Sequence, residues 1–119
     1  MKRELQPATK LTVALGGDER HAHQPLYHAV LAVLHETGIK GATLTKGVLS
    51  YGQRRRIHTL LNEVMMENLP LIIEAVDERE LVEAAAERIA ELLGSHGLVQ
   101  LQPTLIVRRA PAVEGRSTS

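Results

Sequence analysis

The amino-acid sequence predicts an α+β domain of the ferredoxin-like, or split βαβ, kind: an antiparallel sheet with two helices on one face. Two observations predict this fold. Apolar runs of strand length and two amphipathic helical patterns follow one another in the order β-α-β-β-α-β, with a short strand at the end. A polar insert, residues 50–68, lies between the second and third strands, and it is much longer than the usual connection of about five residues. The chain of 119 residues fits one domain.

The first half of the chain predicts a strand, a helix and a second strand. Leu11–Leu15 is a short apolar run that two glycines follow, which is typical of a buried strand. Pro25 stands where a helix would begin, and Gly38 follows the last apolar residue of a helical pattern, so we expect a helix between them. The second strand is predicted from Ala42 to about Leu49.

The second half predicts a third strand and a second helix. The third strand covers residues 69–76, where Pro70 is tolerated only at the start or the edge of a sheet. Asp77 and Glu80 form a capping-box-like pair in front of an amphipathic pattern, which Gly94 closes.

The third strand is apolar on both of its alternating faces. Leu71 and Ile73 point to one face, and Ile72 and Val76 point to the other. Two helices can cover only one of these faces. We therefore expect the other face to be covered by further copies of the chain.

The two ends of the chain differ from its middle. Two short strands are predicted over residues 98–101 and 105–107, interrupted at Pro103. Beyond Arg109 the composition turns to Ala, Pro, Gly, Ser and Thr, which cannot bury enough apolar area to become ordered. We divide the chain into an N-terminal extension over residues 1–9, a domain over 10–109 with its insert at about 50–68, and a disordered tail over 110–119.

Composition argues against several classes of protein. The absence of Cys excludes disulfides and thiol catalysis, and the absence of long apolar runs argues against membrane insertion, so we expect a cytoplasmic protein. Fourteen basic and fourteen acidic residues cancel, and the chain has no Phe or Trp on which bases could stack, so nucleic acid is not an expected partner. The sequence has no nucleophile elbow, Walker loop, dinucleotide fingerprint or metalloprotease helix, so we do not expect this protein to be an enzyme.

Several short motifs, taken in order, resemble those of the PII-like signalling proteins. Within that superfamily the chain is most similar to the uncharacterised family called domain of unknown function one-ninety, and the resemblance spans about residues 10–109. The matching motifs are Pro25-Leu26-Tyr27, Gly38-Ile39-Lys40-Gly41-Ala42-Thr43, Gly47, Tyr51-Gly52, Ile57-His58, Leu69-Pro70, Ile73-Glu74 and Gly97-Leu98-Val99.

This resemblance implies a PII-like homotrimer that binds a small anionic effector in clefts between its subunits. The expected effector is an adenine nucleotide, and no redox cofactor is expected. The insert corresponds to the T-loop of PII proteins, which carries the ligand state to a partner protein. Here that partner would be a protein target such as a membrane transporter or an enzyme.

The resemblance also implies which residues contact the ligand. They fall in three segments: the base of the insert, the loop after the second helix, and the basic end of the last strand. That loop lacks the Lys that usually ends it, and His96 could replace this Lys as an anion donor. The expected ligand contacts are Tyr51, Gly52, Gln53, Arg54, His58, Gly94, His96, Gly97, Arg108 and Arg109.

Two other functions remain open from the sequence. His21 and His23 would put both imidazoles on one side of an extended segment, with Glu19 near, which resembles a weak divalent-metal site. The alternative to a nucleotide sensor is therefore a metal-binding trimer similar to the cation-tolerance branch of the fold. The third hypothesis is that the protein is a structural adaptor that binds no ligand.

The insert itself carries two patterns. Arg54-Arg55-Arg56 is either a solvated loop tip or a contact for an anion or a partner. Apolar residues at helical spacing follow these arginines and predict a short amphipathic helix, which either packs on the body or docks a partner. These residues are Ile57, Leu60, Leu61, Val64 and Met65.

Overall fold

A computed structural model describes residues 3–47, 49–51, 57–59 and 69–109. The elements follow the chain in the order β1 (Arg3–Gly16), β2 (Arg20–His21), β3 (Gln24–Pro25), α1 (Leu26–Glu36), β4 (Thr43–Lys46), β5 (Leu49–Tyr51), β6 (Ile57–Thr59), β7 (Pro70–Asp77), α2 (Arg79–Leu93) and β8 (Gly97–Arg109). The described helices lack the length and apolar character of a segment that crosses a bilayer.

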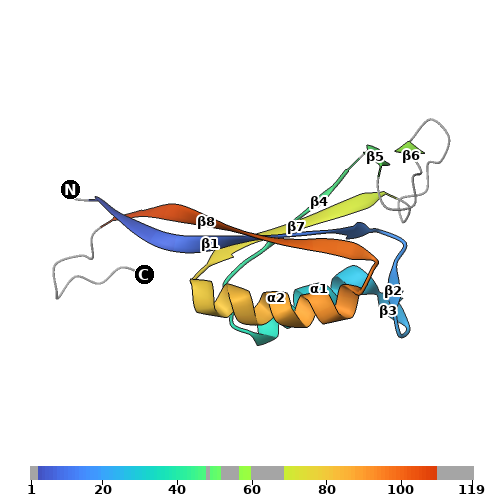
Figure 1. The fold of residues 1–119 in the computed structure, drawn as a ribbon, viewed down its shortest axis with the longest axis horizontal. Coiled ribbons are helices and arrows are strands. Elements are labelled where there is room, and N and C mark those ends of the chain that lie inside the picture. Colours follow the sequence, from blue (N-terminus) through green and yellow to red (C-terminus); the bar gives the residue numbers. More distant parts are fainter. Residues whose placement is uncertain (1–2, 48, 52–56, 60–68, 110–119) are drawn as a thin grey trace, which may run out of the picture.

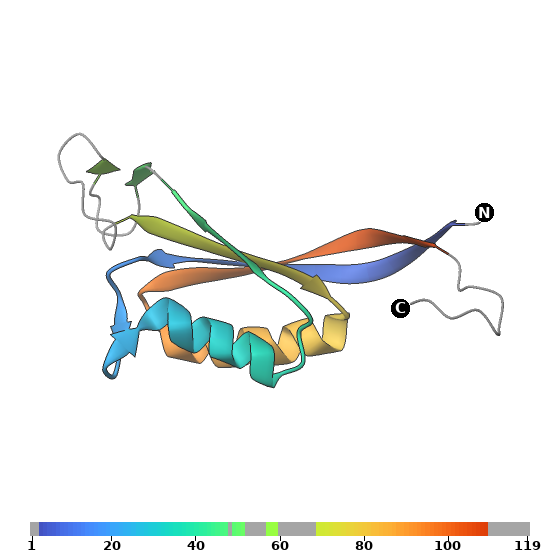
Figure 2. The same ribbon diagram turned by 180° about the vertical axis from the view of Figure 1, so that it is seen from behind.

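The main sheet has the strand order β4-β7-β1-β8, and each neighbouring pair is antiparallel. The helices α1 and α2 lie side by side on one face of this sheet (Figures 1 and 2). This confirms the predicted ferredoxin-like α+β fold with two helices on one face. Two further pairs of short strands, β2–β3 and β5–β6, lie outside the main sheet.

The core lies between the sheet and the helices. Alternate residues of β1 and β7 point toward the helices, as the period of two in a strand requires. Leu11, Val13 and Ile73 are fully buried there, and they meet Val30 of α1 and Ile89 of α2 in one apolar cluster.

Both predicted helices are confirmed, but the way that α2 begins differs from the prediction. Gly38 and Gly94 have φ angles of 92° and 55°, so each adopts the positive φ that glycine tolerates where a helix ends. The predicted capping box is wrong, because Glu78 is the N-cap residue and makes no side-chain cap. The carboxylate of Asp77 instead accepts hydrogen bonds from the backbone N–H of Glu78 at 2.8 Å and of Lys40 at 3.1 Å.

The terminal strands are longer than predicted. Strand β1 begins at Arg3 rather than Leu11, and β8 is one strand rather than two, because it continues through Pro103. Pro103 lies opposite Thr9 on an edge strand, where one side of the backbone needs no partner and a missing N–H is tolerated. The predicted boundary of the domain at residue 10 stays a prediction, and the tail over residues 110–119 lies outside the described residues.

The predicted second strand is divided into two. Strand β4 ends at Lys46, the N–H of Gly47 donates to the carbonyl of Pro70 at 2.8 Å, and β5 begins at Leu49. Strand β5 then pairs with β6, so Ile57 lies in a strand and its assignment to an amphipathic helix was wrong. The rest of that predicted helix lies outside the described residues.

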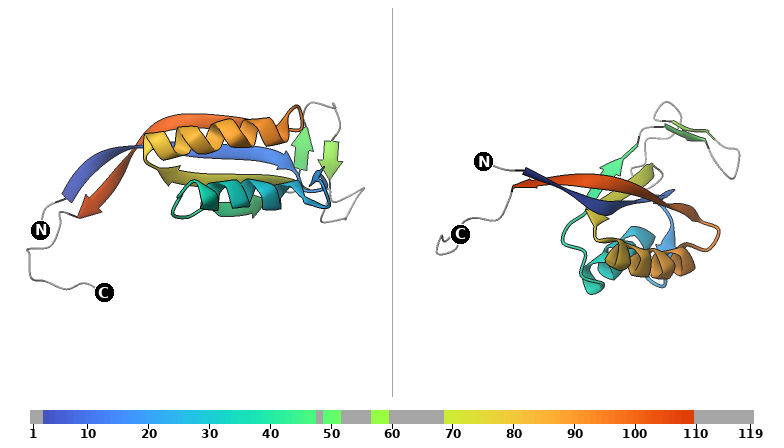
Figure 3. Two further views of the ribbon diagram at one scale, coloured as in Figure 1. Left: turned by 90° about the horizontal axis from the view of Figure 1, so that it is seen from below. Right: turned by 60° about the vertical axis from the view of Figure 1, so that its left-hand side comes forward.

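Beyond the end of β7, strands β1 and β8 continue as a two-stranded ribbon, which we call the arm. It comprises residues 3–8 paired with residues 104–109. Strand β7 pairs only with residues 9–16 of β1, so the arm has no third strand, and it extends past the helices (Figures 1 and 3). Leu5 and Val107 face each other across the arm, and both are exposed.

Candidate ligand-binding site

The loop between α2 and β8 is shaped by close backbone approach. The backbone N–H of His96 donates to the carbonyl of Leu93 at 2.8 Å, which closes a tight turn. Gly97 then pairs with Leu15 of β1. A Cβ atom on Gly97 would lie 2.6 Å from the carbonyl oxygen of Ala14, so a residue with a side chain could not occupy this position without a shift of the backbone.

The turn after β1 and the β5–β6 hairpin lie at the same end of the sheet as this loop. The turn after β1 is held by the N–H of Gly17, which donates to the carbonyl of Leu69 at 2.8 Å. In this turn the Oε1 atom of Glu19 lies 3.3 Å from Nδ1 of His96. The β5–β6 hairpin also follows β4 at this end (Figure 3). The structure therefore brings the loop over residues 94–97 to the end of the sheet from which the insert begins.

The expected contacts in the insert are only partly described. Tyr51 lies in β5 opposite Ile57, and His58 lies in β6 opposite Ser50. The remaining expected contacts of the insert, Gly52, Gln53 and Arg54, lie outside the described residues.

The basic end of the last strand lies at the opposite end of the sheet. Arg108 pairs with Glu4, and Arg109 pairs with Arg3, at the tip of the arm. Gly97 and Arg108 are eleven positions apart on one strand, which at about 3.3 Å per residue separates them by about 36 Å. Within one subunit, the expected ligand contacts therefore form two groups at opposite ends of the sheet.

Arg108 lines a small pocket at the base of the arm, with a volume of about 180 Å³. Its other charged residues are Lys40, Asp77 and Glu78. The Nζ atom of Lys40 lies 3.5 Å from Oδ1 of Asp77. This pocket thus presents two exposed cations, Arg108 and Lys40, beside the buried carboxylate of Asp77 and the exposed Glu78.

The pKa of Asp77 reflects this environment. Burial by itself raises the pKa of the carboxyl group. The hydrogen bonds from the N–H groups of Glu78 and Lys40, with the nearby ammonium group of Lys40, favour the carboxylate more strongly. The net result is a pKa below the usual 3.8, so Asp77 is a stable anion near neutral pH.

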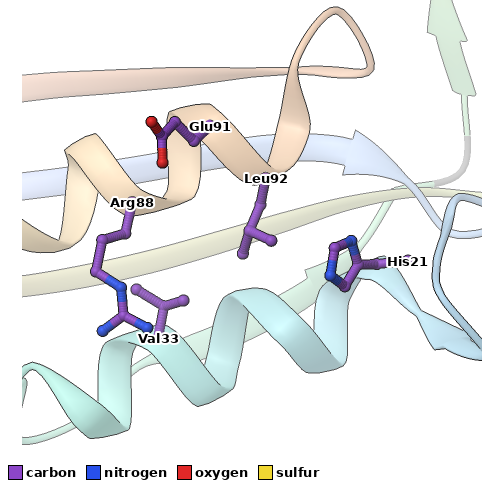
Figure 4. Close-up of a pocket in the computed structure, with 5 residues that line it drawn as sticks. All are labelled: His21, Val33, Arg88, Glu91 and Leu92. Atoms are coloured by element: carbon purple, nitrogen blue, oxygen red, sulfur yellow. The ribbon is translucent and has the colours of Figure 1, made fainter.

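A second hollow lies between the helices, with a volume of about 350 Å³ (Figure 4). Val33 of α1 and Leu92 of α2 form its apolar floor, and Arg88 and His21 lie toward its two ends. Arg88 donates to Oε1 of Glu36 at 2.7 Å, so this guanidinium already has a carboxylate partner.

The structure does not support the extended geometry that was expected for His21 and His23. Ala22 between them has a φ of 57°, and the segment forms the turn of the β2–β3 hairpin. Among the described residues, no group of three or more His, Cys, Asp or Glu side chains is placed to hold a metal ion.

Two contacts join residues that are distant in the sequence, and neither contact was predicted. Glu19 meets His96 and Lys40 meets Asp77 only because the fold places the ends of different elements together. Each of these residues lies close to where an element begins or ends, and this position was the only feature of the sequence that pointed to such contacts. A single sequence contains no information on which of those ends meet.

Comparison with known proteins gives a family and a fold. The model of the protein family DUF190, described as "Uncharacterized ACR, COG1993", matches residues 8–106. A UPF0166 protein of Aquifex aeolicus is 28% identical over 98 residues, which cover 82% of this chain and 90% of that relative. A UPF0166 protein of Methanocaldococcus jannaschii is 29% identical over 89 residues, covering 75% of this chain and 82% of the relative.

Two solved structures that share this fold are those of PII-like proteins. One is CPII, a nitrogen regulatory PII-like protein of Thiomonas intermedia bound to ADP, AMP and bicarbonate, with a TM-score of 0.70 and 20% identity. That likeness covers 87% of this chain and 91% of CPII. Another is a putative PII-like signaling protein of Thermus thermophilus, with a TM-score of 0.59 and 18% identity, covering 87% of this chain and 91% of that one. The fold predicted from the sequence motifs is thereby confirmed.

Proposed function

The chain belongs to the DUF190 family, and we propose that it is a non-enzymatic, PII-like regulatory protein that binds an adenine nucleotide between its subunits. The insert over residues 50–68 reports the bound ligand to a protein target. The assembly is a homotrimer. Support comes from the PII-like fold and from CPII, whose structure contains ADP and AMP.

One observation carries the proposal of a site between subunits. The glycine loop over residues 94–97 and the basic end of β8 lie about 36 Å apart along one strand. A nucleotide that touched both within one subunit would have to span the sheet. Two subunits that meet end to end can bring the loop of one copy to Arg108 of the other.

The groups at the two ends suit a phosphate ligand in different ways. The glycines allow a ligand to approach the backbone closely. The guanidinium group of Arg108 offers a planar fork of donors that matches phosphate oxygens.

Calorimetry with ADP, AMP and ATP tests this proposal. We expect at least one of the three to bind, and Arg108→Ala to weaken that binding by about tenfold or more, because a hydrogen bond to a charged group contributes about 1.5–3 kcal/mol. The matched control is Arg88→Ala, which removes an exposed arginine of α2 that pairs with a carboxylate of α1. This control should bind as the unmodified protein does.

Two results would contradict the proposal. One is the absence of binding heat with all three nucleotides. The other is tight binding of a divalent cation that is lost when His21 and His23 are replaced by Gln, in a protein that binds no nucleotide. The second result would favour the metal-binding alternative.

A further inference from the structure

The arm has one apolar face, which its own subunit leaves exposed. Leu5 lies opposite Val107 across the ribbon, so the two side chains share one face. The pair of Pro7 and Leu105 occupies the next position on the same face. Leu5 is 65% exposed, and Leu105 and Val107 are each 59% exposed. Large apolar side chains therefore lie next to one another in solvent along this face.

The other face of the arm is mostly polar. Glu4 lies opposite Arg108 on this face, and Gln6 follows two positions later. Its large apolar residue, Ile106, is half-buried and lines the pocket at the base of the arm. This division is typical of antiparallel strands with one solvated face and one face that packs on an apolar surface.

The apolar face of the arm continues the alternating positions that form the core. Leu11 of β1 is fully buried in the core cluster, and its partner on β8, Leu101, is 43% exposed. The same set of positions then runs onto the arm, which extends past the helices (Figure 3). The sequence thus places core-type residues on a ribbon that lies beyond the helices of its own subunit.

A second copy of the chain is the cover that suits this face best. A two-stranded ribbon is at best marginally stable in water unless a further strand or a helix supports it. The cover must therefore be present whenever the arm is folded, which a transient protein partner or a lipid surface does not provide. A second copy is always present, and it brings exposed apolar side chains of its own, such as Val76 and Leu98 of the sheet.

We infer that the apolar face of the arm packs on a second copy of this chain, and that the arm is a folded ribbon only in the assembly. This inference rests on the homotrimer of the proposed function, and it adds which element is covered and that its folding depends on assembly. A segment that folds on its partner loses its conformational freedom when the two meet. Assembly and ordering of the arm are therefore one step.

The test compares Leu5→Lys with Gln6→Lys. These variants place the same side chain at neighbouring positions on opposite faces of the arm. Both positions are exposed in one subunit, so neither substitution should disturb a subunit that stays alone. In an assembly that covers the apolar face, Leu5→Lys buries an unpaired ammonium group. In light scattering we expect it to raise the concentration of half-dissociation by about tenfold or more, and Gln6→Lys to leave that concentration unchanged.

Amide exchange then reports whether the arm is folded. We expect slow exchange in residues 3–8 and 104–109 of the assembled unmodified protein and of Gln6→Lys, and fast exchange there in dissociated Leu5→Lys. The centre of β1, at Val13, is buried and should stay protected in all three proteins, which separates loss of the arm from loss of the fold. Dilution of the unmodified protein below the concentration of half-dissociation gives the same comparison without a substitution.

The outcomes separate this inference from the function on which it rests. A Leu5→Lys protein that assembles as Gln6→Lys does would show that no second copy covers the apolar face. A dissociated protein whose arm still exchanges slowly would show that the arm is stable alone. A monomeric unmodified protein with a rapidly exchanging arm would mean that another molecule covers the arm. Each of these results would overturn the inference, whereas an assembly with a protected arm that binds no adenine nucleotide would overturn only the proposed function.

Discussion

At the scale of single residues, Asp77 is a buried polar residue whose carboxylate accepts two hydrogen bonds from the backbone. It is buried and ends β7, where its carboxylate joins the start of α2 to the segment between α1 and β4. From sequence, Asp77 was expected to cap the helix together with Glu80. The residue was identified correctly, but its partner was not, because Lys40 lies 37 positions away in the chain.

Replacing Asp77 by Asn should lower the free energy of unfolding by about 1–3 kcal/mol at pH 7, since a neutral amide satisfies the two backbone N–H donors less well. The pKa of Asp77 is lower in the folded protein than its usual 3.8, so its contribution is complete above that value and is lost as the pH falls through the folded pKa. The difference between variant and unmodified protein should therefore shrink at pH 3. Urea unfolding at both pH values measures it.

Asp18→Asn is the matched control, because Asp18 lies in a turn and is far less buried than Asp77. It should change stability by less than about 0.5 kcal/mol. An Asp77→Asn protein that is as stable as the Asp18→Asn protein at pH 7 would show that the buried hydrogen bonds do not contribute to stability.

At the scale of elements, the sequence predicted the helices, whose apolar residues recur with a strong period. It did not predict the strands that form only by pairing with a distant segment. Both helices were found, because apolar residues at helical spacing ended at glycines that adopt positive φ. The arm was predicted only in part: residues 105–107 were expected to form a strand, but residues 3–8 were not, because they contain Pro7 and are mostly polar, and they become a strand by pairing with residues 104–109. The β5–β6 hairpin was missed for the same reason.

The β5–β6 hairpin provides a test of whether the insert responds to ligand. We expect ADP to slow amide exchange in residues 49–51 and 57–59, because a ligand shifts a segment only by binding one of its states better. Amides at the centre of β1, such as that of Val13, are the internal control and should change little. Unchanged exchange in the hairpin, in a sample whose calorimetry shows bound ADP, would exclude a signalling role for this part of the insert.

At the scale of the whole molecule, the sequence predicted that the sheet face away from the helices is apolar and needs a cover. The structure shows a mixed face. Leu98, Ala14 and Ile72 lie in one row across β8, β1 and β7, but the next row contains Gln100, Thr12 and Glu74. The arm carries further exposed apolar residues, so two surfaces, not one, are available for contacts between subunits. These additional residues are Leu5, Leu105 and Val107.

The last prediction is that the protein is a trimer at micromolar concentration, and that the row through Leu98 lies in its interface. Leu98 is 56% exposed in one subunit, which is costly for a large apolar side chain unless another subunit covers it. Leu98→Arg should therefore shift the trimer toward monomers in light scattering, because an interface would have to bury an unpaired charge.

Ala90→Arg, on the exposed side of α2, is the control and should leave the trimer intact. A trimer that tolerates Leu98→Arg would favour contacts through the arm instead, whereas a monomeric unmodified protein would contradict the proposed site between subunits.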